Sequence, residues 1–296
     1  MTDYPEIASP ARTQAILNKY HLRAKKSLGQ NFLIDLNILH KIIETAGLTK
    51  NDNVIEIGPG IGGLTEQLAK VSGKVLAFEI DENLLPVLAD TLYQYDNVEI
   101  INEDILKANL PKIIDQKFSA NQPVKVVGNL PYYITTPIVM NLLASNVSFE
   151  SITVMMQKEV AERLTSKPNN KSYGSLSVII QQSCDVEVSF IVPKTAFIPQ
   201  PAVDSAIVKI SKKNISGDQP FNSKRFAAFV RGCFMHRRKT LRNNLQGFFG
   251  KTADTKSIIL QGLTDLAIKP EWRPEQLSVS QFISLTNKYH ELGILR

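Results

Sequence analysis

The sequence predicts a doubly wound α/β domain with a Rossmann-like sheet, followed by a small all-α C-terminal domain. Short β-rich runs alternate with helically spaced stretches from about residue 53 to 212, which is typical of a mostly parallel sheet covered by helices. A glycine-rich turn follows the first run, and the chain becomes helical beyond a polar stretch at 211–222. We therefore expect a basic N-terminal extension at 1–25, a main domain at 26–215 and a helical domain at 216–296.

Seven β-rich runs predict the strands of this sheet. The first five belong to a pattern in which runs alternate with helical stretches, so they should be mostly parallel. A proline-rich loop without a helix joins the last two. We expect those two to form an antiparallel pair that closes one edge of the sheet. The expected strands are 54–57, 75–78, 98–101, 124–127, 152–156, 186–192 and 206–210. The expected helices of this region are 64–71, 84–93, 137–144 and 159–165, with others starting near residues 35 and 173.

The bulk composition fits a globular protein and excludes several other classes. Of the 296 residues, 43% are apolar and 21% are charged. No apolar run approaches the roughly 18 residues that cross a bilayer. Cys184 and Cys233 lie far apart, with no CxxC pair and no histidine at ligand spacing. We therefore expect a cytoplasmic protein with neither a disulfide nor a metal site. We also expect a monomer.

The basic residues gather in two segments that contain no acids. One segment lies between Glu6 and Asp35 and the other between Asp218 and Asp254, in a chain of net charge +6. Such segments predict a polyanionic partner. In the second segment the spacing of the basic residues projects them onto one stripe of a helix, although a charged stripe can also be a solvated face. The residues expected to contact the polyanion are Arg23, Lys25, Lys26, Lys224, Arg231, Arg237, Arg238 and Arg242.

A glycine-rich turn follows the first predicted strand. Gly58, Gly60 and Gly63 stand where a strand must turn sharply into a helix while its backbone approaches a ligand. These glycines satisfy the GxGxxG pattern, which alone fits a dinucleotide, another nucleoside or a plain tight turn. The turn therefore predicts a nucleoside site without specifying the nucleoside.

Carboxylates near this turn narrow the choice of cofactor. Glu79 lies about twenty residues after Gly58, at the end of the second strand, where a carboxylate can accept from both ribose hydroxyls. Asp104 follows the third strand and can accept from an adenine amino group, while Ile80 can supply apolar contact to the ring. Glu56 suits a cationic amino acid tail better than a pyrophosphate. Together these residues favour S-adenosyl-L-methionine over NAD as the cofactor.

The tetrapeptide Asn129-Leu130-Pro131-Tyr132 directly follows the fourth predicted strand. Its amide can accept a hydrogen bond from the exocyclic amino group of a base. The proline makes the turn rigid, and the aromatic ring can stack on the face of the base. The tetrapeptide therefore predicts a binding site for a planar base that carries an amino group.

Four segments, in the right order and at the right spacing, resemble the rRNA adenine N6-dimethyltransferase family, and within it the bacterial small-subunit branch. They are Gly29–Leu33, Glu56–Gly60, Asn129–Tyr132 and Phe197–Ser205. The resemblance runs from about Leu22 to the C-terminus, with no departure at the matched positions. It implies a class I S-adenosylmethionine-dependent methyltransferase sheet, with the first segment over the methionine part of the cofactor. The residues expected to bind the cofactor are Asn31, Leu33, Gly58, Gly60, Glu79, Ile80, Asp104, Ile105 and Asn129.

The implied reaction is methyl transfer to N6 of two adjacent adenines in the 3′-terminal hairpin loop of 16S rRNA, within the immature small ribosomal subunit. We expect the Asn129 side-chain oxygen and the Leu130 carbonyl to accept the N6 hydrogens. Pro131 would hold the turn, Tyr132 would stack on the adenine, and Phe197 would form the other wall of the base site. The basic segments would then contact RNA phosphates.

Three other functions remain as alternatives. A large-subunit rRNA methylase of the resistance type would share the core segments, but the extended basic C-terminal domain and the chain length favour the small-subunit enzyme. The protein could instead act mainly by binding, as a ribosome-assembly factor. An NAD-dependent oxidoreductase is disfavoured because the sequence offers no candidate acid or base for hydride transfer.

Overall fold

The chain folds into two compact units, which we call the sheet unit and the helical unit. The sheet unit comprises Met1–Ala161 and Glu187–Ser211, and the helical unit comprises Glu162–Val186 and Lys212–Arg296. The predicted boundary at 215 lies near the last of these divisions, but nothing in the composition indicated that Glu162–Val186 would join the C-terminal helices. The computed structural model describes residues 5–25, 28–119, 122–214 and 217–295.

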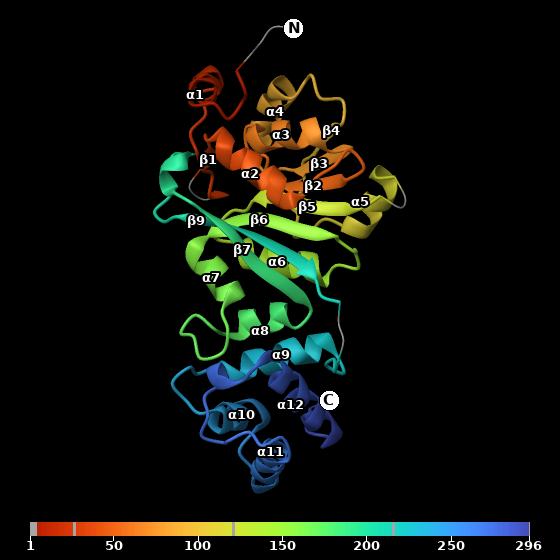
Figure 1. Ribbon diagram of the computed structural model, residues 1–296, viewed down its shortest axis with the longest axis vertical. Coiled ribbons are helices and arrows are strands. Elements are labelled where there is room, and N and C mark those ends of the chain that lie inside the picture. The colour runs from red at the N-terminus through yellow and green to blue at the C-terminus, as the bar shows by residue number, and fades with distance from the viewer. Residues whose placement is uncertain (1–4, 26–27, 120–121, 215–216, 296) are drawn as a thin grey trace. The chain divides into compact units, whose positions relative to one another are not determined.

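A seven-stranded mixed sheet forms the core of the sheet unit (Figure 1). Its strands are β2 (Asn53–Ile57), β3 (Lys74–Phe78), β4 (Val98–Ile101), β5 (Val124–Asn129), β6 (Ser151–Gln157), β7 (Cys184–Val192) and β9 (Ser205–Lys212). Their order is β4-β3-β2-β5-β6-β9-β7. The first five strands pair in parallel, and β9 runs antiparallel to β6 with β7 outside it. All seven predicted runs are therefore strands, and the fold class is confirmed.

Among the residues that the structure describes, seven α-helices accompany these strands, two of them before β2 and the others after it. They are α1 (Pro10–Lys19), α2 (Leu36–Ala46), α3 (Gly63–Val71), α4 (Leu85–Thr91), α5 (Leu110–Lys117), α6 (Thr135–Ala144) and α7 (Lys158–Thr165). The single-turn helix η2 (Glu82–Leu84) precedes α4, and a second one, η3 (Lys194–Ala196), follows β7. Helix α2 packs against α3 and β6. It begins where Asp35 caps two backbone N–H groups and ends at Gly47, whose φ of 61° only glycine adopts readily.

The register of the parallel strands brings their carboxyl ends to one edge. Ile57, the last residue of β2, pairs with Phe78 of β3 on one side and with Gly128 of β5 on the other. The residues that follow these strands therefore converge, because parallel strands all end on the same side of the sheet. This edge is where the glycine turn, Glu79 and the Asn129 tetrapeptide meet.

A second, two-stranded sheet was not predicted. β1 (Phe32–Leu33) pairs antiparallel with β8 (Phe197–Ile198), so that Leu33 lies opposite Phe197. This pairing joins two segments of the family resemblance that are far apart in the chain. It holds the 28–33 segment against the carboxyl edge of the large sheet.

The N-terminal residues pack into the sheet unit, although we expected a separate extension at 1–25. Ile7 and Ile16 are buried in one cluster with Leu84, Val87 and neighbouring side chains of the sheet unit. The backbone N–H of Ile7 also donates to the buried carboxylate of Glu66, 2.8 Å away. From residue 5 onward this segment therefore shares the core of the domain that it precedes.

The helical unit has its own aromatic core. Its helices are α8 (Ser175–Gln181), α9 (Ser223–Cys233), α10 (Leu241–Phe249), α11 (Ala253–Asp265), η4 (Pro274–Gln276) and α12 (Val279–Glu291). Phe229 is fully buried and its ring contacts those of Phe248, Phe249 and Tyr289. Because this core is independent of the large sheet, the predicted all-α C-terminal domain is present.

One expectation about this unit is wrong. The basic stripe supposed a single helix through residues 224–242, but α9 ends at Cys233 and α10 begins only at Leu241. Lys224 and Arg231 lie on α9, Arg238 lies in the intervening loop, and Arg242 lies on α10. The four residues are exposed, but they do not share one face of one helix.

Candidate active site

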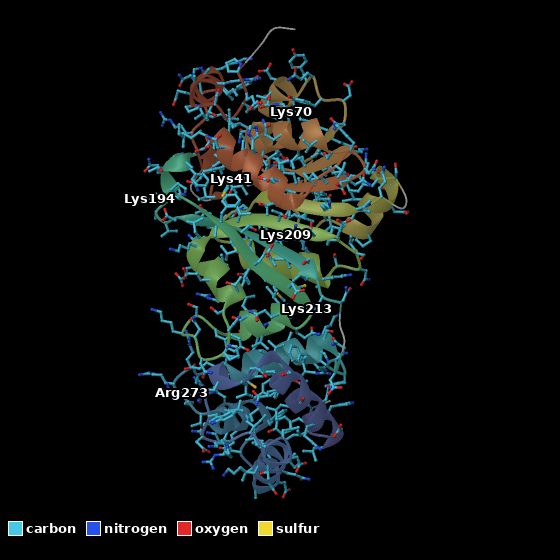
Figure 2. The ribbon with its side chains drawn as sticks, in the orientation of Figure 1. Lys41, Lys70, Lys194, Lys209, Lys213 and Arg273 are labelled. Carbon is cyan, nitrogen blue, oxygen red and sulfur yellow. The ribbon has the colours of Figure 1, made fainter. Side chains whose placement is uncertain are left out.

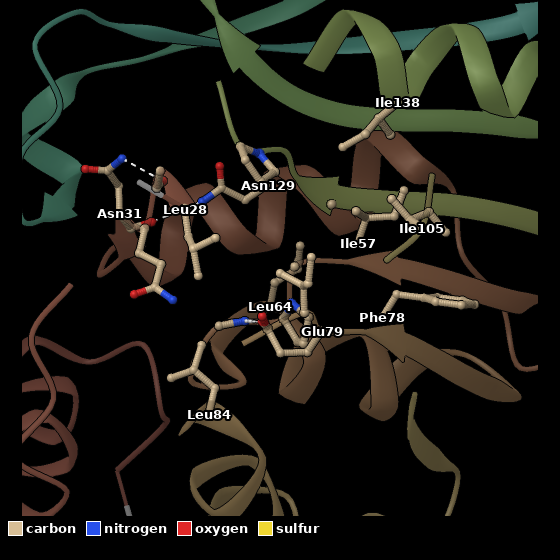
Figure 3. Close-up of a pocket in the computed structure, with 18 of the residues that line it drawn as sticks. Leu28, Asn31, Ile57, Leu64, Phe78, Glu79, Leu84, Ile105, Asn129 and Ile138 are labelled. Carbon is tan, nitrogen blue, oxygen red and sulfur yellow. Dashed lines mark hydrogen bonds between the residues drawn. The ribbon is translucent and has the colours of Figure 1, made fainter. Parts of the chain in front are cut away.

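All nine residues predicted to bind the cofactor line one cavity of about 260 Å³ at the carboxyl edge of the sheet. Figure 3 shows Asn31 and Asn129 toward one end of this cavity and Ile105 and Ile138 toward the other. The cavity is assembled from the 28–33 segment, the loops after β2, β3 and β4, and the end of β5. Its location is typical of ligand sites in open parallel sheets.

The glycine turn after β2 adopts a backbone that other residues resist. Gly58 and Gly60 have φ angles of 72° and 61°, and Gly62 has a φ of 95° at the N-cap of α3. A side chain at Gly60 would also place its Cβ 3.3 Å from the ring of Phe32. The bare backbone can therefore approach a ligand in the cavity, as a nucleoside site requires.

Glu79 directs a buried carboxylate at this turn. It is 5% exposed, and burial raises its pKa above the ordinary value. Its Oε1 accepts from the backbone N–H of Asp81 at 2.8 Å, and its Oε2 accepts from that of Gly60 at 3.4 Å. Each carboxylate oxygen can accept more than one hydrogen bond, so both retain capacity for ribose hydroxyls.

Asp104 and three isoleucines provide the features expected of an adenine site. One carboxylate oxygen of Asp104 accepts from the backbone N–H of Leu106 at 3.0 Å. Its second oxygen accepts no hydrogen bond from the residues described and can accept from an amino group. Ile80, Ile105 and Ile138 supply apolar surface in the same cavity, and Ile80 is exposed at its mouth.

A relay of two amides fixes the orientation of Asn129. Its Nδ2 donates to the backbone carbonyl of Asn31 at 3.1 Å, and the Nδ2 of Asn31 donates to the carbonyl of Gly29 at 3.0 Å. Because the nitrogen of the Asn129 amide is used, its oxygen is the atom left to accept from a substrate. The carbonyl of Leu130 likewise accepts no hydrogen bond within the described part of the chain.

The rest of the tetrapeptide is tied to its surroundings. The carbonyl of Pro131 accepts from the Thr135 hydroxyl at 2.9 Å, and Pro131 lines the cavity. The hydroxyl of Tyr132 lies 2.6 Å from that of Ser205, which links this tetrapeptide to the fourth family segment. Tyr132 itself lies outside the cavity lining, whereas Tyr133, not singled out from the sequence, lines the cavity and is exposed.

Phe197 and Glu56 do not lie where they were predicted. Phe197 was expected to form a wall of the base site, and Glu56 to contact the cationic tail of the cofactor. Phe197 is 1% exposed and packs in the core with Leu39 and Ile207, so its ring does not form an open wall beside the cavity. Glu56 is fully buried and does not line the cavity. Both its oxygens, like the hydroxyl of Thr65, lack hydrogen-bond partners among the described residues. Burial raises the pKa of Glu56 to about 8, so a charged contact to a cationic tail is not supported.

The residues predicted to contact a polyanion are exposed where the structure describes them. Lys25 pairs with Asp81 at 2.7 Å, the Arg237 guanidinium donates to the carbonyl of Lys171, and Lys26 lies outside the described residues. Exposed without a described ion pair are Arg23, Lys224, Arg231, Arg238 and Arg242.

Other basic residues have structural partners. Among the lysines labelled in Figure 2, Lys70 pairs with Glu6 at 2.7 Å and Lys209 donates to the Thr45 carbonyl at 2.9 Å. Some of the basic side chains are therefore occupied by contacts within the protein and are less available to bind a polyanion.

The described residues contain neither a membrane-spanning helix nor a cluster of metal ligands. No helix among them is long and apolar enough to cross a membrane. No group of three or more His, Cys, Asp or Glu side chains within the described ranges could hold a metal ion. Cys184 and Cys233 are buried free thiols.

Curated relatives match the chain over nearly its whole length. A protein of Levilactobacillus brevis named ribosomal RNA small subunit methyltransferase A is 58% identical, over 99% of both chains. A protein of the same name from Enterococcus faecalis is 52% identical over 97% of both. The similarity thus includes the helical unit as well as the cavity.

Solved structures with the same fold agree. A dimethyladenosine transferase from Plasmodium falciparum has a TM-score of 0.74 and 26% identity, covering 88% of this chain and 98% of that one. The 23S rRNA methyltransferase ErmE has a TM-score of 0.65 and 26% identity, covering 87% and 99%. The family model described as "Ribosomal RNA adenine dimethylase" matches residues 21–290. The chain therefore belongs to the ribosomal RNA adenine dimethylase family.

Proposed function

We propose that this protein transfers methyl groups from S-adenosyl-L-methionine to N6 of two adjacent adenines in the 3′-terminal hairpin loop of 16S rRNA. The products are N6,N6-dimethyladenosines, formed during biogenesis of the small ribosomal subunit. The observation that carries the proposal is Asn129, whose oriented amide stands at the edge of a cavity that also contains Glu79 and Asp104. The names of the curated relatives support the small subunit as the source of the target.

The residues of the cavity fit the proposed cofactor. Glu79 would accept from the ribose hydroxyls, and the free oxygen of Asp104 would accept from the adenine amino group. Ile80 and Ile105 would pack on the adenine ring, while Asn31 and Leu33 would bound the methionine part. When bound, S-adenosyl-L-methionine supplies an activated methyl group.

The chain's own contribution to methyl transfer is position and hydrogen bonding. The amino nitrogen of adenine is a poor nucleophile because its lone pair is delocalised into the ring. The Asn129 oxygen and the Leu130 carbonyl would accept its hydrogens and hold the nitrogen in line with the methyl group. No strong base is required, since the cationic product can lose a proton to water.

The target adenine must leave its stack to reach these acceptors, which favours a loop over a duplex. Tyr132 would stack on the extruded base, with its hydroxyl held by Ser205. Pro131 would fix the turn between the acceptors and this ring. The basic residues of the helical unit would hold the surrounding phosphates.

Incubation of labelled S-adenosyl-L-methionine with immature small and large subunits, followed by mapping of dimethyladenine, tests the proposal. We expect label confined to two adjacent adenines near the 3′ end of the small-subunit RNA. Label only in the large subunit would establish the alternative that ErmE's name represents. Tight subunit binding without any label would establish an assembly factor that acts by binding.

A further inference from the structure

Asp81 does not line the cavity but is hydrogen-bonded to two residues that do, Glu79 and Gln30. It lies two residues beyond Glu79 and is 5% exposed. Its Oδ1 accepts from the Lys25 ammonium at 2.7 Å, and its Oδ2 accepts from the Gln30 amide at 2.8 Å. One carboxylate just beyond β3 therefore holds both Lys25 and Gln30, two residues that precede β1 in the chain.

Each described hydrogen-bond partner of the Asp81 carboxylate donates to it. Besides Lys25 and Gln30, the backbone N–H and the side-chain amide of Asn83 donate to Oδ1 at 3.1 and 2.8 Å. Burial opposes the charge, but the hydrogen bonds from Lys25, Asn83 and Gln30 outweigh it and lower the pKa to about 2. Asp81 is therefore an anion throughout the neutral range, and a group with its own donor would fit poorly here.

The bond to Gln30 is not explained by local structure. Asp81 caps the short helix η2, and the contacts to Asn83 complete that cap. The contact to Gln30 spans 51 positions in the chain and leaves the cap unaffected. The other amide atom of Gln30, Oε1, accepts from the backbone N–H of Lys25 at 2.8 Å. Both ends of the Gln30 side chain are therefore fixed.

The same segment is held at its other end by the base site. From Gln30 the chain runs to Asn31, whose carbonyl receives the Asn129 amide. The backbone N–H of Asp81 also donates to Glu79 at 2.8 Å. Hydrogen bonds and one step along the backbone thus connect the proposed ribose-binding carboxylate, through Asp81, Gln30 and Asn31, to the proposed acceptor of the target amino group.

We infer that Asp81 is a positioning residue that fixes Glu79 and the 28–33 segment together, and so couples cofactor binding to the orientation of Asn129. The inference rests on the proposed function of the cavity. Loss of the Gln30 contact frees the segment that lines the cavity, which weakens cofactor binding. It also loosens the carbonyl that orients Asn129, which slows methyl transfer.

A charge-swap cycle tests this with four proteins: the wild type, Asp81→Asn, Gln30→Glu, and the double variant. In Asp81→Asn the new amide N–H faces the donating amide of Gln30, so that two donors meet. In Gln30→Glu two carboxylates face each other and repel. We expect each single variant to weaken S-adenosylhomocysteine binding in calorimetry by about tenfold, the usual effect of one unsatisfied buried polar group. In the double variant the new amide can donate to the new carboxylate, so affinity returns to within about threefold of the wild type.

Turnover gives the second readout. The single variants should show a raised KM for S-adenosyl-L-methionine and a lowered kcat, and the double variant should recover both. Asp90→Asn is the matched control, because Asp90 pairs with Lys19 at 2.6 Å on the same unit but does not line the cavity. It should leave affinity and turnover unchanged.

Unchanged affinity in both single variants overturns the inference while leaving the proposed function intact. Equal loss in all three variants without recovery, at unchanged melting temperature, overturns it as well. A wild-type protein that does not bind S-adenosylhomocysteine would instead overturn the proposed function itself.

Discussion

Asn129 can accept from a target amino group only while its amide keeps one orientation. The bond from its Nδ2 to the Asn31 carbonyl sets that orientation, and Asn31 is itself held by the carbonyl of Gly29. In the proposed mechanism Asn129 therefore acts through its oxygen, and the neighbouring backbone determines which atom of the amide is presented. The sequence identified the residue, whereas its partner came from a segment 98 positions away.

Replacement of Asn129 by Ala should lower the rate of methyl transfer by about 100-fold or more, since a preoriented polar group at the reacting atom is lost. RNA affinity should change little, because the basic residues lie elsewhere. Single-turnover transfer and filter binding with small subunits would measure the two effects. Asn97→Ala is the matched control: its amide also donates to backbone carbonyls, but outside the cavity. Near-normal turnover of the Asn129 variant would remove this residue from the mechanism.

Glu56 makes the stability of the protein depend on pH. Burial raises its folded-state pKa from the model-compound value of 4.5 to about 8. Between these values the folded protein keeps a proton that the unfolded chain releases, so the free energy of unfolding falls as the pH rises. The contribution is complete below about pH 4.5 and is lost as the pH passes about 8.

Glu56→Gln should abolish this dependence, because glutamine is neutral at every pH. Relative to the wild type, the variant should gain on the order of 3 kcal/mol between about pH 5 and about pH 8. Urea unfolding at a series of pH values measures the difference. Glu82→Gln, at an exposed glutamate, serves as the control. Parallel profiles for the wild type and the Glu56 variant would show that this carboxyl is ionised in the folded protein.

At the scale of elements, the sequence predicted those strands and helices that have a local periodic pattern of apolar residues. The large sheet was predictable because β-rich runs and helices alternate. The position of the cavity was predictable as well, because parallel strands end on one side of the sheet. The two-residue strands β1 and β8 leave no periodic signal and exist only through pairing across the chain. For the same reason, the burial of Phe197 could not be read from its surroundings in the sequence.

The break between α9 and α10 has a specific cause. Asn244 is 1% exposed, and its Oδ1 accepts from the backbone N–H of His236 at 2.9 Å. Its Nδ2 donates to the carbonyls of His236, Lys239 and Thr240 at 3.1 to 3.4 Å. Apolar spacing continues through this region, so periodicity predicted a helix where one buried side chain instead supports a loop. That loop carries Arg237, Arg238 and Lys239.

Asn244→Ala should therefore weaken RNA binding without removing a charge. We expect a loss of about 1–3 kcal/mol in the free energy of unfolding, because buried backbone groups lose their partner. Subunit affinity should fall several-fold at temperatures where the protein is still folded. Asn243→Ala, at the exposed neighbour on the same helix, should leave both quantities unchanged. Equal RNA affinity of the two variants would mean that the loop's shape does not matter for binding.

At the scale of the whole molecule, our proposal assigns methyl transfer and most RNA contacts to different units. The cavity belongs entirely to the sheet unit, and most of the predicted RNA contacts belong to the helical unit. The cavity alone could hold the cofactor and one adenine. The choice of a particular RNA must therefore come from charges distributed outside it. Affinity of this kind depends on salt, because each phosphate contact releases counterions.

Replacing Arg238 and Arg242 with Glu tests whether RNA affinity depends on the position of the basic residues or only on the net charge of the protein. The control reverses Lys41 and Lys194, two exposed lysines of the sheet unit (Figure 2), so that both double variants lower the net charge from +6 to +2. If position matters, only the arginine variant should bind small subunits weakly. Its plot of log affinity against log salt should lose about 0.7–0.9 of slope for each phosphate contact removed. Equal losses in both variants would mean that the subunit responds to total charge, and the helical unit would then have no special role in recognition.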